Sequence, residues 1–417
     1  MPWKSLIHNG ICIPEKYKIQ HGYVHFNNKK IKITADLEEA FNLYAHEKNK
    51  DEKFKQNFLN SIKHLLTFKC EHISQIKLPN FKREKINLKN INKYNSCLIN
   101  NKNEKIDRCF ADPACIFKGR GNHLQRGTFK PAIKQNNISL NISNSKIPDG
   151  NWKHICNDNT VDWIASWVDP VTKKVKYIYP SVQSKLNSEN SIQKFDFARK
   201  LKKKLKIVRE MYNNDIINYK NIYDLQHALC TYLIDKTCIR CGSDEEKKTF
   251  GCTTLLKKHI VIDKNMLKLN FVGKDSIVCK KSLKIDDNYI TIFNNILKTK
   301  TLNSQIFDKI DNVSLNKYLN NMMTNLTAKV FRTCHASSLL QNSLKKYDNV
   351  CDYKKTLIKV SDLCNHTNTQ TAKVNYLDPR ITVAFCRKNN INLKKCFSDN
   401  LIVKYEWAQK TPSSFQF

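Results

Sequence analysis

The chain has 417 residues, enough for two or three domains with hydrophobic cores of their own. Its 72 Lys and Arg residues against 37 Asp and Glu give a net charge of +35, which repels itself unless a polyanion shares it. Nucleic acid is therefore the leading partner, and a membrane surface is the rival. The sequence contains no apolar run of 18 residues, signal peptide or lipidation motif, and its 41% hydrophobic content excludes a histone-like chain.

The sixteen cysteines are scattered, and without a secretory signal they are expected to be reduced thiols that pack as small apolar residues. Cys238 and Cys241 form one Cys-x-x-Cys pair, but structural zinc needs four ligands and no second pair stands at zinc spacing. The acidic runs at 244–246 and 286–287 have the pattern of solvated turns. We therefore predict neither a metal site nor a cofactor.

Glycine and proline divide the chain into two halves. All nine glycines lie at or before Gly273, and eight of the ten prolines lie within the first 180 residues. The front half should therefore be rich in strands and turns and the back half mostly helical. In the front half we expect a helix over 36–68, short helices or a solvated arm over 76–105, and a hairpin over 161–179 that turns at Asp169-Pro170.

A basic, glycine-rich run spans residues 117–127 (FKGRGNHLQRG). Glycine lets the backbone approach a ligand closely, and the interleaved cations suit phosphate or a nucleic-acid groove. A plain basic turn is an equally good interpretation of this run by itself.

In the back half, apolar spacing predicts a long helix over 195–212 and a second helix from Ile222 that ends near Arg240. Leu267, Leu269 and Phe271 alternate with polar residues, which indicates a strand that turns at 272–275 and places Lys274 at the tip of a hairpin. Apolar residues at helical spacing over 319–344 predict that the chain is helical from there on.

The segment 371–386 (TAKVNYLDPRITVAFC) contains a candidate nucleophile. Asp378 followed by Pro379 is typical of an N-cap and first helical position, so Tyr376 lies two residues ahead of a helix. The positive end of the helix dipole favours an anion there, and a tyrosine beside an anion site could attack a phosphodiester. The alternative is a tyrosine that packs its ring under the helix cap.

Several motifs, in order along nearly the whole chain, resemble eukaryotic-type DNA topoisomerase IB. They are the runs WKSLIHNG (3–10), FKGRGNH (117–123), LIDK (233–236), FVGKDS (271–276), KVFRT (329–333), LCNH (363–366) and NYLDPRITVA (375–384).

The resemblance implies an α+β, two-lobed DNA clamp with an α/β cap lobe and a mainly α-helical catalytic lobe of tyrosine-recombinase type. It implies a DNA-binding region over 1–185, a catalytic core over 186–366 and a short C-terminal region over 367–417. The implied catalytic residues are Arg240, Lys274, Arg332, His366 and Tyr376. The implied DNA contacts are Lys118, Arg120, Asn122, His123, Arg126, Asp275 and Asn375.

Two departures from the family pattern are visible. The Trp-Lys motif begins at Trp3, where family members have a long charged extension, and only nine residues separate His366 from Tyr376, where members have a coiled-coil linker. We therefore expect a compact enzyme with a short tether on its nucleophile. Arg120, Asp275 and Asn375 also match family contacts to camptothecin-type compounds, so we expect drug binding with weaker trapping.

The implied activity is relaxation of supercoiled DNA through a 3′-phosphotyrosyl intermediate, without ATP or metal. Two arginines and a histidine suit the growing charge of an attacked phosphodiester, and Lys274 is the natural general acid because desolvation among cations loosens its proton. A tyrosine site-specific recombinase and a non-enzymatic basic chromatin-binding protein are the alternatives. The expected partner is double-stranded DNA, bound by a monomer in the nucleus or in a viral or organellar DNA-replicating compartment.

Overall fold

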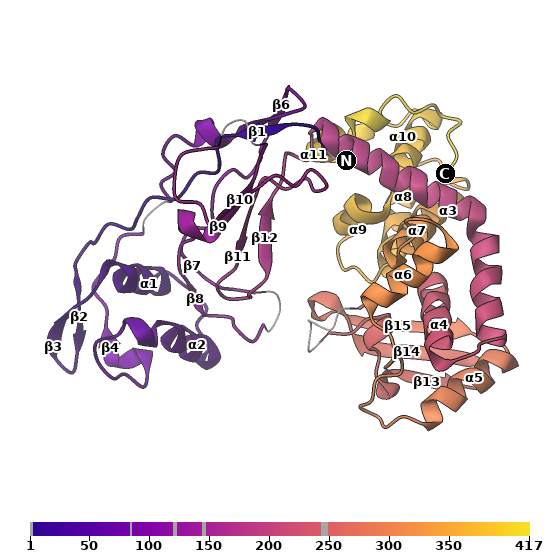
Figure 1. Ribbon diagram of the computed structural model, residues 1–417, viewed down its shortest axis with the longest axis horizontal. Helices are drawn as coiled ribbons and strands as arrows, with labels where there is room; N and C mark the ends of the chain where they lie inside the picture. The colour runs from indigo at the N-terminus through magenta and orange to yellow at the C-terminus, as the bar shows by residue number, and fades with distance from the viewer. Residues whose placement is uncertain (1–2, 84–85, 120–122, 144–146, 243–248) are drawn as a thin grey trace. The chain divides into compact units, whose positions relative to one another are not determined.

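A computed structural model describes residues 3–83, 86–119, 123–143, 147–242 and 249–417. The chain divides into two compact units, Met1–Asn187 (unit 1) and Ser188–Phe417 (unit 2) (Figure 1). Strands predominate in the described part of unit 1 and helices in that of unit 2, so the α+β prediction is confirmed. The three-domain division at 185 and 366 stays a prediction.

Unit 1 contains two helices where the sequence predicts one over 36–68. Helix α1 (Ala35–Ala45) begins at Thr34, whose side chain accepts a hydrogen bond from the Leu37 amide. Helix α2 (Glu52–Ile62) begins at Asp51, which accepts from the Phe54 amide in the same way. The helical prediction is thus confirmed for most of this stretch, but as two helices, because Asp51 starts a new helix after the polar segment that follows α1.

Short strands form the rest of unit 1 and pair into small sheets. Their orders among the described residues are β1-β5-β6, β3-β2-β4, β7-β8 and β10-β9-β11-β12. The strands are β1 (Leu6–His8), β2 (Tyr23–Phe26), β3 (Lys29–Lys32), β4 (Ile76–Lys77), β5 (Ser96–Ile99), β6 (Lys102–Lys105), β7 (Cys115–Ile116), β8 (Phe129–Lys130), β9 (Ile138–Asn141), β10 (His154–Cys156), β11 (Ala165–Val168) and β12 (Val175–Ile178).

Two hairpins of unit 1 test the sequence predictions directly. The hairpin over 161–179 is confirmed, since β11 and β12 pair antiparallel with Ala165 opposite Ile178. The segment 76–105, predicted as short helices or an arm, contains the short 3₁₀ helix Ile91–Tyr94 but also the β5–β6 hairpin, which was not predicted. Its two-residue turn, Asn100-Asn101, has φ of 51° and 61°, the left-handed backbone that such tight turns need and that Asn tolerates.

The basic run 117–127 joins β7 to β8 and is anchored at its end by Gly127. A Cβ on this residue would lie 2.4 Å from the Phe54 carbonyl oxygen, and its φ is +98°, so only glycine fits against α2 here. Unit 1 has two buried apolar clusters, one around Trp3, Ile138 and Trp167 and one under α1 and α2.

Unit 2 begins with long helix α3 (Lys185–Ile217), which starts just before the unit boundary, and α4 (Ile222–Thr237). An antiparallel sheet of order β13-β14-β15 follows, formed by β13 (Ile260–Asp263), β14 (Met266–Val272) and β15 (Val278–Lys284). The predicted hairpin is confirmed, with Val272 paired to Val278 at its end. Arg209 of α3 pairs with buried Asp235 of α4 at 2.8 Å, which fixes these helices side by side.

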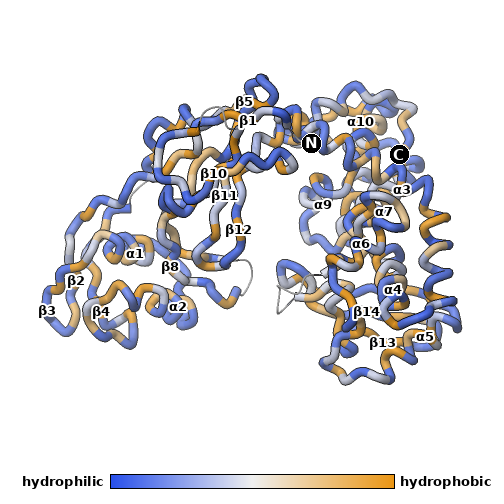
Figure 2. Tube along the Cα trace, viewed as in Figure 1, coloured by the Kyte–Doolittle hydropathy of each residue, from blue (hydrophilic) through white to orange (hydrophobic). Residues whose placement is uncertain are grey.

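The remaining helices are α5 (Asp287–Lys298), α6 (Asn312–Met322), α7 (Ala328–Leu344), α8 (Val350–Leu363), α9 (Thr369–Tyr376), α10 (Pro379–Lys388) and α11 (Asp399–Lys404). They contribute to one large buried cluster that the sheet shares, except α11, whose Leu401 lies in a smaller cluster. Apolar and polar stretches alternate along these helices in Figure 2, as one-sided burial requires.

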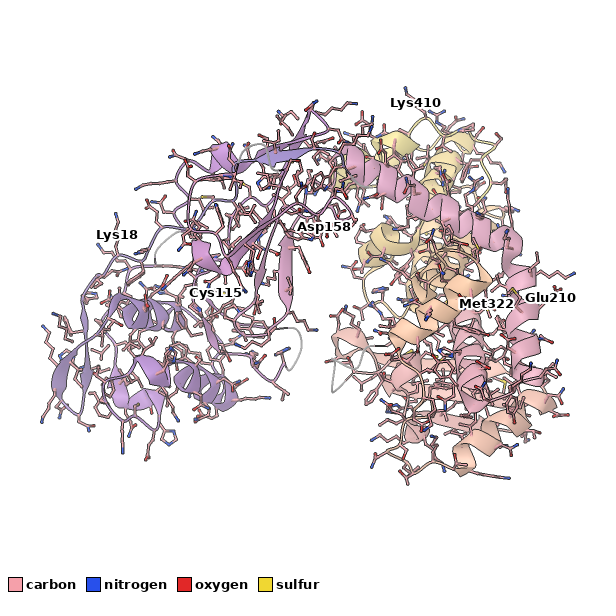
Figure 3. All side chains as sticks on the ribbon, viewed as in Figure 1. Lys18, Cys115, Asp158, Glu210, Met322 and Lys410 are labelled. Atoms are coloured by element: carbon pink, nitrogen blue, oxygen red, sulfur yellow. The ribbon has the colours of Figure 1, made fainter. Side chains whose placement is uncertain are left out.

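Charged side chains cover the outside of both units. Nitrogen-tipped side chains project from their surfaces in Figure 3, where the labelled Lys18 and Lys410 are examples of exposed lysines. Within the described residues, no helix is both long and apolar enough to cross a membrane.

Candidate active site

Tyr376 is the last residue of α9, and its side chain is 4% exposed. Asp378 caps α10 and Pro379 occupies its first turn, as predicted. The buried Ser337 of α7 donates to the Tyr376 carbonyl oxygen at 2.9 Å and accepts from the Asp378 amide at 3.1 Å. One serine therefore holds the backbone on both sides of Leu377, which fixes where the tyrosine ring can lie.

The N-terminus of α10 is not a free anion site. The Asp378 carboxylate accepts from the Arg380 amide at 3.0 Å and forms a fork with the Arg380 guanidinium at 2.8–3.1 Å. Burial raises the pKa of Asp378, against the opposing effect of Arg380. The chain's own carboxylate thus occupies the position where the sequence suggested a bound anion, and the anion-binding groups lie elsewhere around Tyr376.

Arg332 of α7 is the side chain in closest contact with the tyrosine. Its Nη1 donates to the Tyr376 hydroxyl oxygen at 2.5 Å, its Nη2 donates to the Cys364 carbonyl at 2.5 Å, and its guanidinium lies 4.5 Å from the ring centroid. Nε of Arg332 is buried without a hydrogen-bond partner among the described residues. A buried N–H of an always-charged group is costly to leave unpaired, so this atom is poised for an anionic ligand.

His366 is placed by the way α8 ends. The His366 amide bonds the Ser361 carbonyl at 2.9 Å and the Asn365 amide bonds the Asp362 carbonyl at 3.1 Å, while Asn365 has φ of +51°. This is a Schellman ending with asparagine in the left-handed position, which explains the Asn-His pair physically. The turn delivers the imidazole to within 5.7 Å of the Tyr376 ring, between centroids.

Arg240 and His366 are neighbours, with 3.4 Å between Nη2 and Nε2. Burial, together with Arg240 and Arg332, lowers the pKa of His366 to about 4. The ring is therefore neutral at pH 7, and since a guanidinium only donates, Nε2 is the acceptor in this contact.

The segment around Gly251 and Cys252 holds the backbone of Arg240 in place. Helix α4 ends at Cys238, which has φ of +55°, and the Arg240 carbonyl then accepts from the Cys252 amide at 2.8 Å. A Cβ on Gly251 would lie 2.8 Å from that carbonyl, so the close approach needs glycine.

Lys274 lies at the tip of the β14–β15 hairpin, as predicted. The Gly273 amide bonds the Ile277 carbonyl at 2.8 Å, and Asp275 and Ser276 adopt left-handed backbone to close the turn. Lys274 lines one pocket together with Arg240 and Arg332. Its side chain is exposed, so the desolvation expected of a general acid has to come from a bound ligand.

The structure thus brings five predicted residues around one point in unit 2, and we call them the active-site cluster: Arg240, Lys274, Arg332, His366 and Tyr376. Asp275 acts electrostatically on His366, and Asn375 is half-buried on α9. No Asp or Glu is among the described residues that line the pocket.

The predicted contacts of unit 1 are described in part. Lys118 is exposed and pairs with Glu47 at 3.1 Å, and His123 packs edge-on against Phe117. Arg126 pairs with Asp51 at 2.8 Å. Their DNA contacts stay predictions, and those of Arg120 and Asn122 fall outside the described residues.

Comparison with protein families covers nearly the whole chain with three matches, of which the last two overlap. Residues 1–90 and 82–180 match the DNA-binding fragment of eukaryotic DNA topoisomerase I, residues 183–382 match its catalytic core, and residues 352–417 match the C-terminal topoisomerase domain. The chain belongs to the eukaryotic DNA topoisomerase I family. The resemblance stated from the motifs is therefore confirmed.

The individual topoisomerases that this chain resembles have low sequence identity to it. DNA topoisomerase 1 beta of Arabidopsis thaliana is 28% identical over all of this chain and 59% of its own length. DNA topoisomerase 1 of Caenorhabditis elegans is 28% identical, covering 97% of this chain and 66% of its own length, and that of Homo sapiens is 26% identical, covering 97% and 70%. The chain thus spans less than two thirds of the first two relatives.

A solved structure of the site-specific recombinase XerH is 14% identical and matches with a TM-score of 0.30 over 45% of this chain and 50% of its own.

Sequence reasoning missed two contributors to this topoisomerase-family site. Ser337 is fully buried. Nothing in the sequence marked it as part of the site except its position five residues after Arg332. The Cys364 residue was interpreted as a packing residue, and its thiol is indeed buried, but its carbonyl also fixes Arg332. Backbone acceptors carry no side-chain signature, so no motif could have shown this contact.

Proposed function

We propose that this protein is a type IB DNA topoisomerase, which relaxes supercoiled duplex DNA by transient cleavage of one strand. The observation that carries the proposal is the 2.5 Å hydrogen bond from Arg332 to the Tyr376 hydroxyl, at a point where three further polar groups of the right chemistry, Arg240, Lys274 and His366, converge. Family membership supplies the reaction class, and the geometry supplies a role for each residue.

The first step is attack on phosphorus by the Tyr376 oxygen, which loses its proton to solvent. Arg332 stabilises the negative charge that develops on that oxygen as the proton leaves. A bond forms between the tyrosine and the 3′ phosphate, and the bond to the 5′ oxygen breaks. Lys274 gives a proton to the departing 5′ oxygen, so the products are a 3′-phosphotyrosyl protein and a 5′-hydroxyl end.

The non-bridging phosphate oxygens are held by the donors that the protein leaves available. Among the described residues, Nε of Arg332 lacks a hydrogen-bond partner, and the Arg240 guanidinium has one weak contact, to the His366 ring nitrogen at 3.4 Å. When a phosphate oxygen draws Arg240 away, the neutral His366 is free to present an N–H to the same group. Losing one such donor costs about 3–4 kcal/mol of transition-state stabilisation.

Rejoining is the reverse of cleavage. The phosphotyrosyl bond conserves the energy of the phosphodiester, so relaxation should proceed in EDTA without ATP. Helix α9, at whose end the tyrosine lies, is tied to the C-terminal region because Lys373 donates to the Cys396 carbonyl at 2.7 Å. The short connection between His366 and Tyr376 is thus a packed helix, which supports weaker trapping by camptothecin-type compounds beside Asp275 and Asn375.

Duplex DNA is the proposed partner, and the net charge of +35 and the match of unit 1 to a DNA-binding fragment support it. A clamp formed by the two units around the duplex, a monomeric enzyme and a nuclear or other DNA-replicating compartment are parts of the same proposal. The relatives are eukaryotic topoisomerases.

The test is relaxation of a supercoiled plasmid in EDTA, with Tyr376→Phe as the control. We expect the wild type to relax the plasmid and, after denaturation, to carry the 3′ end of the cut strand, whereas the Phe variant binds DNA but forms no adduct. Exchange of strands between two plasmids would indicate a recombinase, and binding without any cleavage would indicate a non-enzymatic chromatin protein.

A further inference from the structure

Lys281 of β15 lies on the same hairpin as Lys274 but reaches in another direction. Its Nζ donates to the carbonyl oxygens of Asp362 at 2.7 Å and Leu363 at 3.0 Å. These contacts fasten the hairpin to the end of α8, which is 81 positions further along the chain.

The two carbonyls belong to the last turn of α8, beyond its regular backbone hydrogen bonds, and that of Asp362 also accepts from the Asn365 amide. The negative end of the helix dipole also favours a cation at this place. The same turn supplies the Cys364 carbonyl to Arg332 and continues into His366. Lys281 therefore binds the same turn that positions Arg332 and His366 of the active-site cluster.

We propose that Lys281 is a positioning residue for strand cleavage, which fixes the hairpin of Lys274 against the segment of His366; this inference rests on the proposed function. The Lys274 side chain is exposed and makes no hydrogen bond or ion pair with the described residues, so the position of its ammonium depends on the hairpin. The hairpin and the turn touch at the pocket, where a Cβ on Gly273 would lie 3.6 Å from Nδ2 of Asn365.

The positive charge of Lys281 does not by itself account for the contacts that this side chain makes. Its neighbour Lys280 points to the opposite face of β15, as alternation in a strand requires, and is exposed. Each adds the same charge to a basic surface, but Lys281 is half-buried and binds two carbonyls. Lys280 is thus a matched control for the removal of one positive charge from this strand.

The experiment measures single-turnover cleavage of a duplex whose cut strand releases a short 5′-hydroxyl fragment. Wild type, Lys281→Met, Lys281→Arg and Lys280→Met are compared on a normal scissile phosphate and on one with sulfur at the 5′-bridging position. Sulfur leaves without a proton, so it makes a misplaced general acid harmless. Thermal unfolding of each variant is followed alongside.

We expect Lys281→Met to cleave the normal substrate about 10- to 100-fold more slowly than wild type, since a small misplacement of a reacting group has costs of this size. On the sulfur substrate, the cleavage rate of Lys281→Met should come within about 3-fold of wild type. Lys281→Arg should keep most of its activity. Lys280→Met should cleave both substrates at a rate near that of wild type.

Three results would overturn the inference. Normal cleavage by Lys281→Met would show that the contact positions nothing. Slow cleavage of both substrates by Lys281→Met would show that the lysine supports the arginines or the fold rather than the general acid. If Lys280→Met is slowed equally, charge is the cause. Failure of the wild type to cleave either substrate would instead refute the proposed function, and the inference with it.

Discussion

Both units contain a cluster of cations, and the two clusters differ in their counter-charges: carboxylates neutralise the one in unit 1. There, Lys130 is 3% exposed and ion-paired with Asp112 and with Asp169, the latter at 2.6 Å, and Lys176 joins the same carboxylates at 2.8 and 3.1 Å. We call these four residues the unit 1 charge network. Burial acts to raise the pKa of Asp169, but hydrogen bonds from Lys130, Thr172 and Lys176 outweigh it and lower the pKa.

The active-site cluster has the opposite composition. Its arginines and lysine surround a pocket lined, among the described residues, by no carboxylate, and one buried guanidinium N–H lacks a partner. Buried charges without partners are unfavourable in the free protein and become favourable only when an anion arrives. The comparison teaches that uncompensated charge, rather than charge itself, marks the site where this protein binds its substrate.

The largest expected effects separate the roles within the cluster. Lys274→Ala should slow cleavage about 10²- to 10⁴-fold, because general acid catalysis contributes that much, and a 5′-bridging sulfur should restore the rate. Arg332→Ala should lose about 10²- to 10³-fold, and sulfur should not rescue it, because its charge acts on phosphate and phenolate oxygens. Single-turnover cleavage measures both.

Rescue of Arg332→Ala together with failure to rescue Lys274→Ala would show that the two roles are assigned wrongly. The free energy of unfolding is the matched control. For Arg332→Ala it should stay close to that of wild type, since the loss of the hydrogen bonds to Tyr376 and Cys364 is offset by removal of a buried cation from the pocket that Arg240 also lines.

Lys130→Met should give the reverse result in unit 1. It removes the buried lysine from Asp112 and Asp169 and leaves them the half-exposed Lys176, and breaking a buried pair typically costs about 3–5 kcal/mol. Chemical denaturation measures this loss, and Lys176→Met, which removes the half-exposed member, should cost less. The cleavage rate of DNA-bound Lys130→Met should stay near wild type. A Lys130→Met variant as stable as wild type would mean that the unit 1 charge network is not a structural one.

The hairpin of Lys274 and the cap at Asp378 were predictable because both signals are local. Strict alternation over 267–271 specifies a strand, and Asp-Pro specifies a helix start. The β5–β6 hairpin was missed because β5 is only four residues long and its partner β6, Lys-Asn-Glu-Lys, has no apolar residue and so no apolar alternation. Its one clear signal was Asn100-Asn101, whose left-handed backbone closes the turn.

The members of the active-site cluster could be named from the sequence through the family resemblance, but their arrangement could not. Arg332 meets the Tyr376 hydroxyl across 44 positions, and Lys281 meets α8 across 81. Such contacts depend on how helices pack, and the acceptors involved include backbone carbonyls that every residue has. The capped N-terminus of α10 also shows that a helix end supports an anion site only when no nearby carboxylate fills it.

The smallest expected effect compares two histidines whose pKa values both lie at about 4. His8 in unit 1 is lowered by burial, with both ring nitrogens already paired, to the Asn141 carbonyl at 2.9 Å and the Gly10 amide at 3.0 Å. His366 is lowered by burial and by two arginines. An unfolded histidine has a pKa of about 6.5, so each makes the free energy of unfolding fall as the pH drops from about 6.5 to about 4.

Binding of duplex DNA should change the pKa of His366 but not that of His8. A phosphate beside His366 adds negative charge where the arginines now add positive charge, so its pKa should rise on binding and its share of the acid sensitivity should shrink. His8 has no such neighbour in the proposed complex and should not move. Titration of labelled histidine side chains by NMR, in Tyr376→Phe with and without duplex, measures both. If the pKa of His366 does not change when DNA binds, the phosphate lies away from this cluster. An equal pKa shift at His8 would mean that DNA binding perturbs both units alike.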